Sequence, residues 1–284
     1  TLRETMTEYS MYDRRVAGWF DDGTDGSRRF YDGRGWVTLE PPSERSATTA
    51  GPPFVVVPAT LVVLGVSLAV ARIVAEHLVE RGASGVVPVV VPVVVTYAPV
   101  VAWLAMVRKS GDDTGIGWSA RRIDLLWGPV AWLGIVTVQV FVIAILIVLG
   151  IPIAGNAESV TGRGTGPVAA VTITVVAITI VPLVEELVFR GVLIAGLSTR
   201  VGTTAAVVLQ AVAFGAAHLD PTRGWATTGT AIVLTGVGLG LGIAAVATRR
   251  LAAPILAHAI FNGVALAVVW SGVGERVELD ILGG

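Results

Sequence analysis

The chain has 284 residues, of which 54% are hydrophobic and 14% are charged, and its mean hydropathy is +0.76. Soluble domains carry roughly 25% charged residues, so a water-soluble globule of this composition is excluded, as is disorder over most of the chain. The net charge of −1 gives no field that attracts nucleic acid, so no nucleic-acid partner is expected. The absence of cysteine excludes disulfides, thiol nucleophiles and thiolate metal sites.

The polarity of the chain changes near Gly51, which predicts two parts. Residues 1–50 form a polar N-terminal tail with seven arginines and no signal-peptide pattern, and a Pro/Ser/Thr linker covers 41–53. Within the tail, aromatic residues alternate with DG and GRG turn signals over residues 17–39, which predicts a β-hairpin or a three-stranded sheet. This stretch resembles a short Trp-bearing module of unknown function that precedes membrane segments in many bacterial proteins.

Residues 51–284 contain apolar runs that match the ~20 residues a helix needs to cross a bilayer. A helix satisfies its own backbone groups in lipid, so the sequence predicts an all-α polytopic membrane protein with about seven transmembrane helices. The expected segments are 54–74, 85–107, 125–150, 166–199, 203–218, 226–248 and 251–270. In the sixth, the run GVGLGLG at 236–242 repeats glycine at the spacing that lets helices pack closely.

The basic residues predict the orientation. With a cytoplasmic N-terminus, fourteen of the twenty arginines and lysines fall on the cytoplasmic side and five on the opposite side. The positive-inside rule therefore favours a multi-pass protein of the cell membrane whose N-terminus is cytoplasmic.

Three charged residues interrupt the fourth apolar segment: Glu185, Glu186 and Arg190. A charge in hydrocarbon costs at least ~2.5–3.5 kcal/mol, so such groups indicate function by default. On a helix, Glu186 and Arg190 are four residues apart and can form an ion pair, whereas Glu185 points elsewhere and is free to face a cavity. Pro182, just before them, is expected to kink the helix.

Two other apolar segments contribute the remaining polar groups. His218 follows the apolar run of the fifth segment, and in the seventh segment His258 and Asn262 are four residues apart on one helix face. The third histidine, His77, has charged neighbours and is expected at the surface.

This set of residues can carry out hydrolysis. A carboxylate and an imidazole can hold and deprotonate water, while an imidazole and an amide can stabilise the oxyanion that forms when water attacks a carbonyl. Alternatively, Glu185, His218 and His258 could bind Zn²⁺ with water as the fourth ligand. Two other classes stay open: a transporter or proton relay that uses the same buried charges, and a non-catalytic immunity or scaffold protein.

The motifs EELVFR, FGAAH and HAIFN, in this order on successive membrane segments, resemble the EExxxR, FxxxH and HxxxN/B motifs of the CPBP family. This family comprises CAAX proteases and bacteriocin-processing, Abi-type intramembrane proteases. The resemblance implies that 51–284 is a protease domain acting on a membrane-embedded or lipidated peptide or protein. It also implies roles: Glu185 as base, His218 positioning water, His258 and Asn262 as oxyanion donors, and Glu186 and Arg190 as supporting partners.

The family is described both as metal-dependent and as a metal-free glutamate protease. Asn262 beside His258 suits an oxyanion hole better than a metal shell, so the sequence favours chemistry without zinc.

Overall fold

The computed structural model describes the backbone of a small N-terminal sheet and nearly all of the apolar part of the chain. The described residues are 18–21, 28–31, 36–37, 54–109, 119–153, 166–220 and 222–272, with side chains from residue 54 onward except at 108 and 109. The chain divides into two compact units, Thr1–Thr49 and Ala50–Gly284. The linker predicted at 41–53 lies outside the described residues.

The N-terminal unit contains a three-stranded antiparallel sheet in the order β1-β2-β3. Its strands are β1 (Gly18–Asp21), β2 (Arg28–Tyr31) and β3 (Trp36–Val37). Trp19 pairs with Phe30, and Tyr31 pairs with Trp36. The small sheet predicted from the turn signals is therefore confirmed, whereas the resemblance to a Trp-bearing module stays a prediction.

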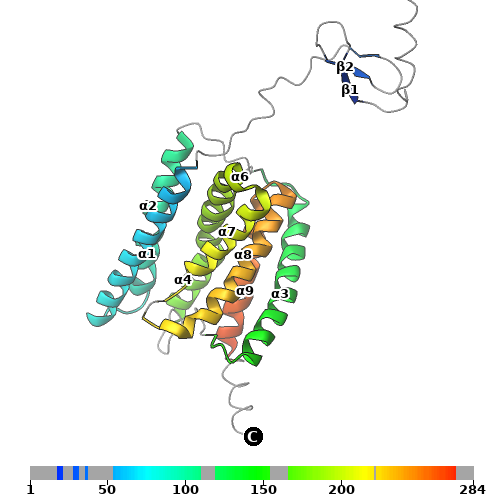
Figure 1. The fold of residues 1–284 in the computed structure, drawn as a ribbon. Helices are drawn as coiled ribbons and strands as arrows, with labels where there is room; N and C mark the ends of the chain where they lie inside the picture. Colours follow the sequence, from blue (N-terminus) through cyan, green and yellow to red (C-terminus); the bar gives the residue numbers. More distant parts are fainter. Residues whose placement is uncertain are drawn as a thin grey trace, which may run out of the picture. The chain divides into compact units, whose positions relative to one another are not determined.

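The second unit is a helical bundle (Figure 1). Its long helices are α1 (Val56–Glu80), α2 (Val87–Lys109), α3 (Asp124–Val148), α8 (Thr228–Thr248) and α9 (Ala252–Ser271). The fourth apolar segment consists of α4 (Pro167–Ile178), α5 (Ile180–Glu186), the π-helix η3 (Leu187–Ile194) and α6 (Ala195–Val201). The shorter elements are α7 (Thr203–Ala216) and the 3₁₀ turn η4 (Gly224–Thr227).

Six helical segments within the described ranges are long and apolar enough to cross a membrane. The fifth predicted segment, 203–218, is α7, whose 14 residues extend only ~21 Å, less than the ~30 Å hydrocarbon thickness. The chain is thus a multi-pass helical membrane protein, as predicted, with six segments of spanning length and one shorter apolar helix.

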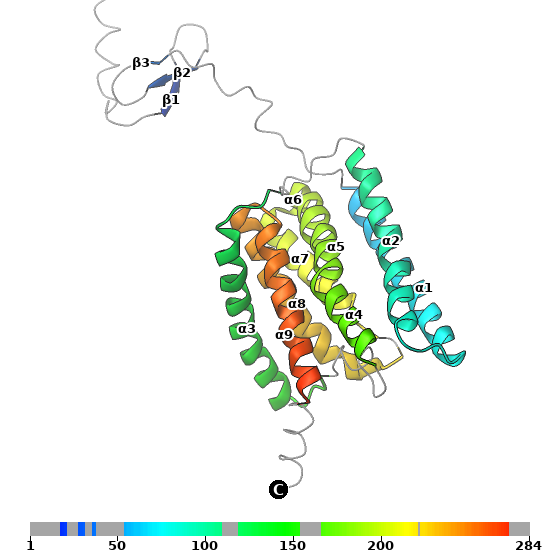
Figure 2. The same ribbon diagram turned by 180° about the vertical axis from the view of Figure 1, so that it is seen from behind.

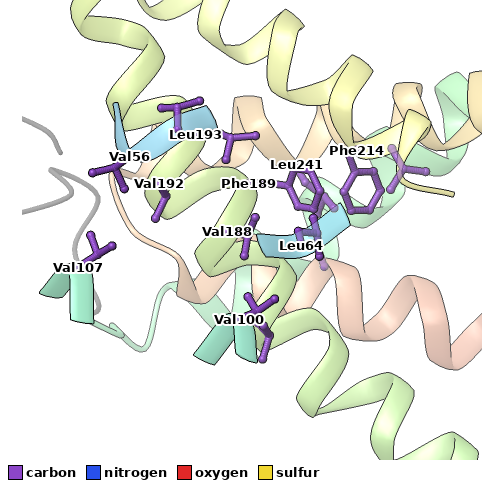
Figure 3. Packing of buried hydrophobic residues seen from close by; sticks show 14 of the residues in the cluster. Val56, Leu64, Val100, Val107, Val188, Phe189, Val192, Leu193, Phe214 and Leu241 are labelled. Atoms are coloured by element: carbon purple, nitrogen blue, oxygen red, sulfur yellow. The ribbon is translucent and has the colours of Figure 1, made fainter. Parts of the chain in front are cut away.

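The helices of this unit form a hairpin and a larger group. In Figure 1 and in the reverse view of Figure 2, α1 lies beside α2, and α3 lies beside α9. The ion pair between Arg250 Nη2 and Asp124 Oδ1, at 2.6 Å, ties the turn between α8 and α9 to the start of α3. The α1–α2 hairpin packs on the π-helix through a buried apolar cluster that includes Leu64, Val100 and Val188 (Figure 3).

The fourth segment is broken at Thr179, where φ is −121° and ψ is −72°. Pro182 explains the position of the break, because it has no N–H to donate to the carbonyl of Ile178 and its ring crowds that carbonyl. The kink predicted near Pro182 is therefore confirmed. A 35-residue segment would be ~50 Å long as a straight helix, far more than the hydrocarbon core requires.

Glycines of α8 form contact surfaces on two sides of the helix. A Cβ at Gly236 or Gly240 would meet Gln139 or Ile135 of α3, whereas one at Gly238 or Gly242 would meet residues of α7. The predicted close helix packing at 236–242 is confirmed.

The tightest approach between α7 and α8 is at Gly215, where an added Cβ would overlap Thr235 Oγ1 and the carbonyl oxygen of Ala231. We expect Gly215→Ala to lower the free energy of unfolding by about 1–3 kcal/mol, because the α8 backbone must move away. The measurement is the thermal unfolding midpoint of the purified protein in detergent. Gly65→Ala is the matched control, since no atom of a neighbouring described helix lies within 4 Å of its added Cβ. Equal midpoints for the two variants would contradict the prediction.

Candidate active site

Glu186 and Arg190 form a buried ion pair across the junction of α5 and the π-helix. Arg190 Nη1 donates to Glu186 Oε1 at 2.8 Å, and both side chains are 0% exposed. The pair predicted from the four-residue spacing is confirmed. A π-helix is rare and often marks a functional site, and here it begins directly after the two glutamates.

Arg190 is also held by α7 and α8. Its Nη2 donates to the carbonyl oxygen of Gly238 at 3.1 Å, and the guanidinium lies 4.8 Å from the centre of the Phe214 ring. Gln210 Nε2 donates to the same carbonyl at 2.9 Å, and this side chain is fully buried. Gln210 could not be found from the sequence, because its contact with the Gly238 carbonyl joins α7 to another helix.

His258 connects α9 to both glutamates. Its Nδ1 lies 2.9 Å from Glu186 Oε1, and its Nε2 lies 3.8 Å from Glu185 Oε2. Because Glu186 is also bound to Arg190, one carboxylate oxygen receives both a guanidinium and an imidazole. When His258 Nδ1 donates to Glu186, Nε2 is left facing Glu185.

The two oxygens of the Glu185 carboxylate have different surroundings. Oε1 accepts a hydrogen bond of 2.7 Å from the hydroxyl of Tyr97 on α2. Oε2 is buried and has no hydrogen-bond partner among the described residues. The side chain as a whole is 13% exposed. Glu185 therefore presents one free, shielded oxygen towards His258.

His218 lies in the turn directly after α7. Its Nδ1 is 2.8 Å from the carbonyl oxygen of Phe214, which leaves Nε2 as the free ring nitrogen. The ring centres of His218 and His258 lie 4.9 and 5.8 Å from that of Phe214. Both imidazoles therefore flank one phenyl ring, although no hydrogen bond or ion pair joins His218 to Glu185 within the described part of the chain.

Asn262 lies one turn beyond His258 on α9, but its amide points to the break in the fourth segment. Its Nδ2 donates to the carbonyl oxygen of Ala177 at 2.8 Å. The oxyanion role of Asn262 stays a prediction, and it would use the second amide hydrogen. His77 is exposed, as expected, with Nδ1 4.0 Å from Glu80.

The residues predicted as zinc ligands do not form a ligand set in this arrangement. No three His, Asp or Glu side chains of the described ranges are placed to hold one metal ion. His258 Nδ1 lies against Glu186 and His218 Nδ1 against a backbone carbonyl, so each ring keeps Nε2 for another contact, and zinc binding by Glu185, His218 and His258 stays a prediction.

A polar contact holds the loop that follows His218. Asp220 Oδ1 forms an ion pair with Arg72 of α1 and accepts hydrogen bonds from the backbone N–H and hydroxyl of Thr222. Burial alone would raise the pKa of Asp220, but the hydrogen bonds from Thr222 and Arg72 outweigh it and lower this pKa from 3.8 to about 2. The loop is thereby tied to the α1–α2 hairpin.

Fold and site together define a multi-pass helical membrane protein with a buried cluster of two glutamates, an arginine and a histidine. Residues 167–264 match the family model described as Type II CAAX prenyl endopeptidase Rce1-like. This segment, roughly a third of the chain, is similar to that family and contains all seven fixed positions of the three motifs. The resemblance to the CPBP and CAAX protease family is confirmed. No curated protein and no solved structure matches the chain.

We expect Arg190→Met to lower the free energy of unfolding by about 3–5 kcal/mol, because it leaves the buried Glu186 carboxylate without its cation. Adding Glu186→Gln should restore part of this loss, since the double variant no longer buries an unpaired charge. Chemical denaturation in detergent compares the three proteins. A double variant no more stable than Arg190→Met would contradict this account.

Because the pKa of Asp220 is lower in the folded state, the stability it contributes is present above pH ~4 and is lost as the pH falls towards 2. Asp220→Asn should lower the free energy of unfolding by about 1 kcal/mol at neutral pH, a small value because the Arg72 pair is partly exposed. Unfolding midpoints between pH 7 and 2 test this. The two proteins should converge at the acid end, and a constant difference would contradict the assignment.

Proposed function

We propose that this protein is an intramembrane endopeptidase of the CAAX-protease type, which hydrolyses a peptide bond of a membrane-associated protein or peptide. One observation carries the proposal: the free oxygen of Glu185 faces the free ring nitrogen of His258 at 3.8 Å, while the other nitrogen of that ring is held by Glu186. The family of residues 167–264 supports the same activity.

In the proposed reaction, Glu185 is the general base. Its Oε2 takes a proton from water, and the water oxygen adds to the scissile carbonyl carbon to form a tetrahedral oxyanion. The C–N bond then breaks with its electron pair going to nitrogen. That nitrogen takes the proton from Glu185, which returns to the carboxylate form as acid and amine products leave.

His258 would stabilise the oxyanion as an imidazolium. Its Nδ1–H is held by Glu186, so in the protonated ring Nε2–H is directed to the side where Glu185 acts. Arg190 fixes Glu186 from the other side. In this proposal His218 orients water through Nε2, and Asn262 adds a second oxyanion donor.

The substrate would be a membrane-embedded or lipidated peptide, because Glu185 and His258 belong to helices of spanning length. The proposed orientation has the N-terminus in the cytoplasm. The proposed mechanism uses only side chains of this chain and includes no step through zinc.

We expect Glu185→Gln to lower the cleavage rate by about 10²–10⁴-fold without changing expression or the unfolding midpoint, because the amide cannot accept the proton. Two assays apply: cleavage of a farnesylated CAAX peptide in proteoliposomes, and mass spectrometry of new peptide termini in membranes that contain wild type or variant. Glu80→Gln is the matched control, since this carboxylate is exposed and lies outside the cluster.

Termini that appear equally with wild type and Glu185→Gln would show that Glu185 is not the base. If wild type produces no new termini but carries ions across the liposome membrane, the transporter alternative replaces the protease.

A further inference from the structure

The α1–α2 hairpin contributes one hydroxyl group to the site, that of Tyr97. Tyr97 lies on the face of α2 that also carries Val100 and Leu104, and this face packs on an apolar cluster that contains Val184 and Val188. Val184 directly precedes Glu185, and Val188 follows it by three residues. Tyr97 is therefore brought to the glutamate by the packing of α2 on the fourth segment.

Because of this contact, one oxygen of the Glu185 carboxylate is hydrogen-bonded and the other is not. Tyr97 donates its only hydroxyl hydrogen to Oε1 at 2.7 Å, and this is the one hydrogen bond that Glu185 receives from a side chain among the described residues. Oε2 then lies buried, unpartnered and directed at His258 Nε2. Without the phenol, the carboxylate could rotate and exchange its two oxygens.

We propose that Tyr97 is a positioning residue of the active site, which holds Glu185 Oε1 so that Oε2 acts as the base. This inference rests on the proposed function, and it assigns a role to a helix outside the segment 167–264 that matches the protease family. The hairpin then completes the site as well as packing against it.

A second contact shows that the hairpin is held to the bundle without Tyr97. Arg72 of α1 is paired with Asp220, and Leu64 of α1 belongs to the buried cluster on the π-helix. Loss of the Tyr97 hydroxyl should therefore leave the hairpin in place. A defect of a Tyr97 variant can then be assigned to Glu185.

The test is Tyr97→Phe, which keeps the ring and removes the hydroxyl. We expect kcat for the farnesylated CAAX peptide to fall about 10- to 100-fold, as for loss of a hydrogen bond to a charged group, with KM within about twofold. The matched control is Trp103→Phe, which removes a hydrogen-bond donor of the same helix, because Trp103 Nε1 donates to Thr60 Oγ1 at 2.8 Å and not to the site. The control should keep kcat.

A second measurement does not need turnover. Infrared spectra of protein labelled with ¹³C at glutamate carboxylates should show a shifted carboxylate band in Tyr97→Phe relative to wild type. The shift should be absent when both proteins also carry Glu185→Gln.

The outcomes separate the two proposals. An unchanged kcat, a fall shared by Trp103→Phe, or a band shift that persists with Glu185→Gln overturns the role of Tyr97 and leaves the protease proposal standing. Two results would overturn the protease proposal. One is full activity of Glu185→Gln, and the other is a wild type that neither cleaves the peptide nor produces termini that depend on Glu185. In that case the infrared comparison alone tests whether the Tyr97 hydroxyl binds the Glu185 carboxylate.

Discussion

One carboxylate oxygen, Oε1 of Glu186, is the shared partner of the buried charged side chains of the site. Glu186 Oε1 receives Arg190 from its own segment and His258 from α9, and all three side chains are buried. Removing one member of such a set costs far more than replacing the whole set, because an uncompensated charge stays in a low-dielectric interior. The network therefore fixes where α9 lies against α5, and Glu185, the next residue along the chain, is placed by it.

The broken fourth segment supplies the geometry that a straight helix could not. The carbonyl of Ala177, two residues before the break at Thr179, accepts a hydrogen bond from Asn262, and the π-helix begins directly after Glu186. An irregular backbone at membrane depth is tolerated only where protein or water satisfies its polar groups. Asn262 does this here, so its amide serves the backbone of the site and not only the chemistry predicted for it.

The sequence predicted what depends on spacing along one helix, and less of what depends on contacts between helices. The Glu186–Arg190 pair follows from a four-residue interval, and the break follows from the missing N–H of Pro182. Tyr97 and Gln210 could not be found this way. Gln210 is a single polar residue in an apolar run and Tyr97 has only Thr96 beside it, so only the packing of α7 or α2 decides which partner each one meets. Likewise, nothing in the spacing of His258 and Asn262 indicates that the amide turns to Ala177.

The short α7 has a consequence for the lipid around the protein. Its 14 residues fall about three residues per side short of the hydrocarbon thickness, so the bilayer must thin beside it or the polar loop after His218 must sink below the headgroups. Either adjustment brings water closer to the membrane midplane on the side that carries His218. The bilayer would thus be deformed by the protein at the place where the proposed hydrolase would have to admit water.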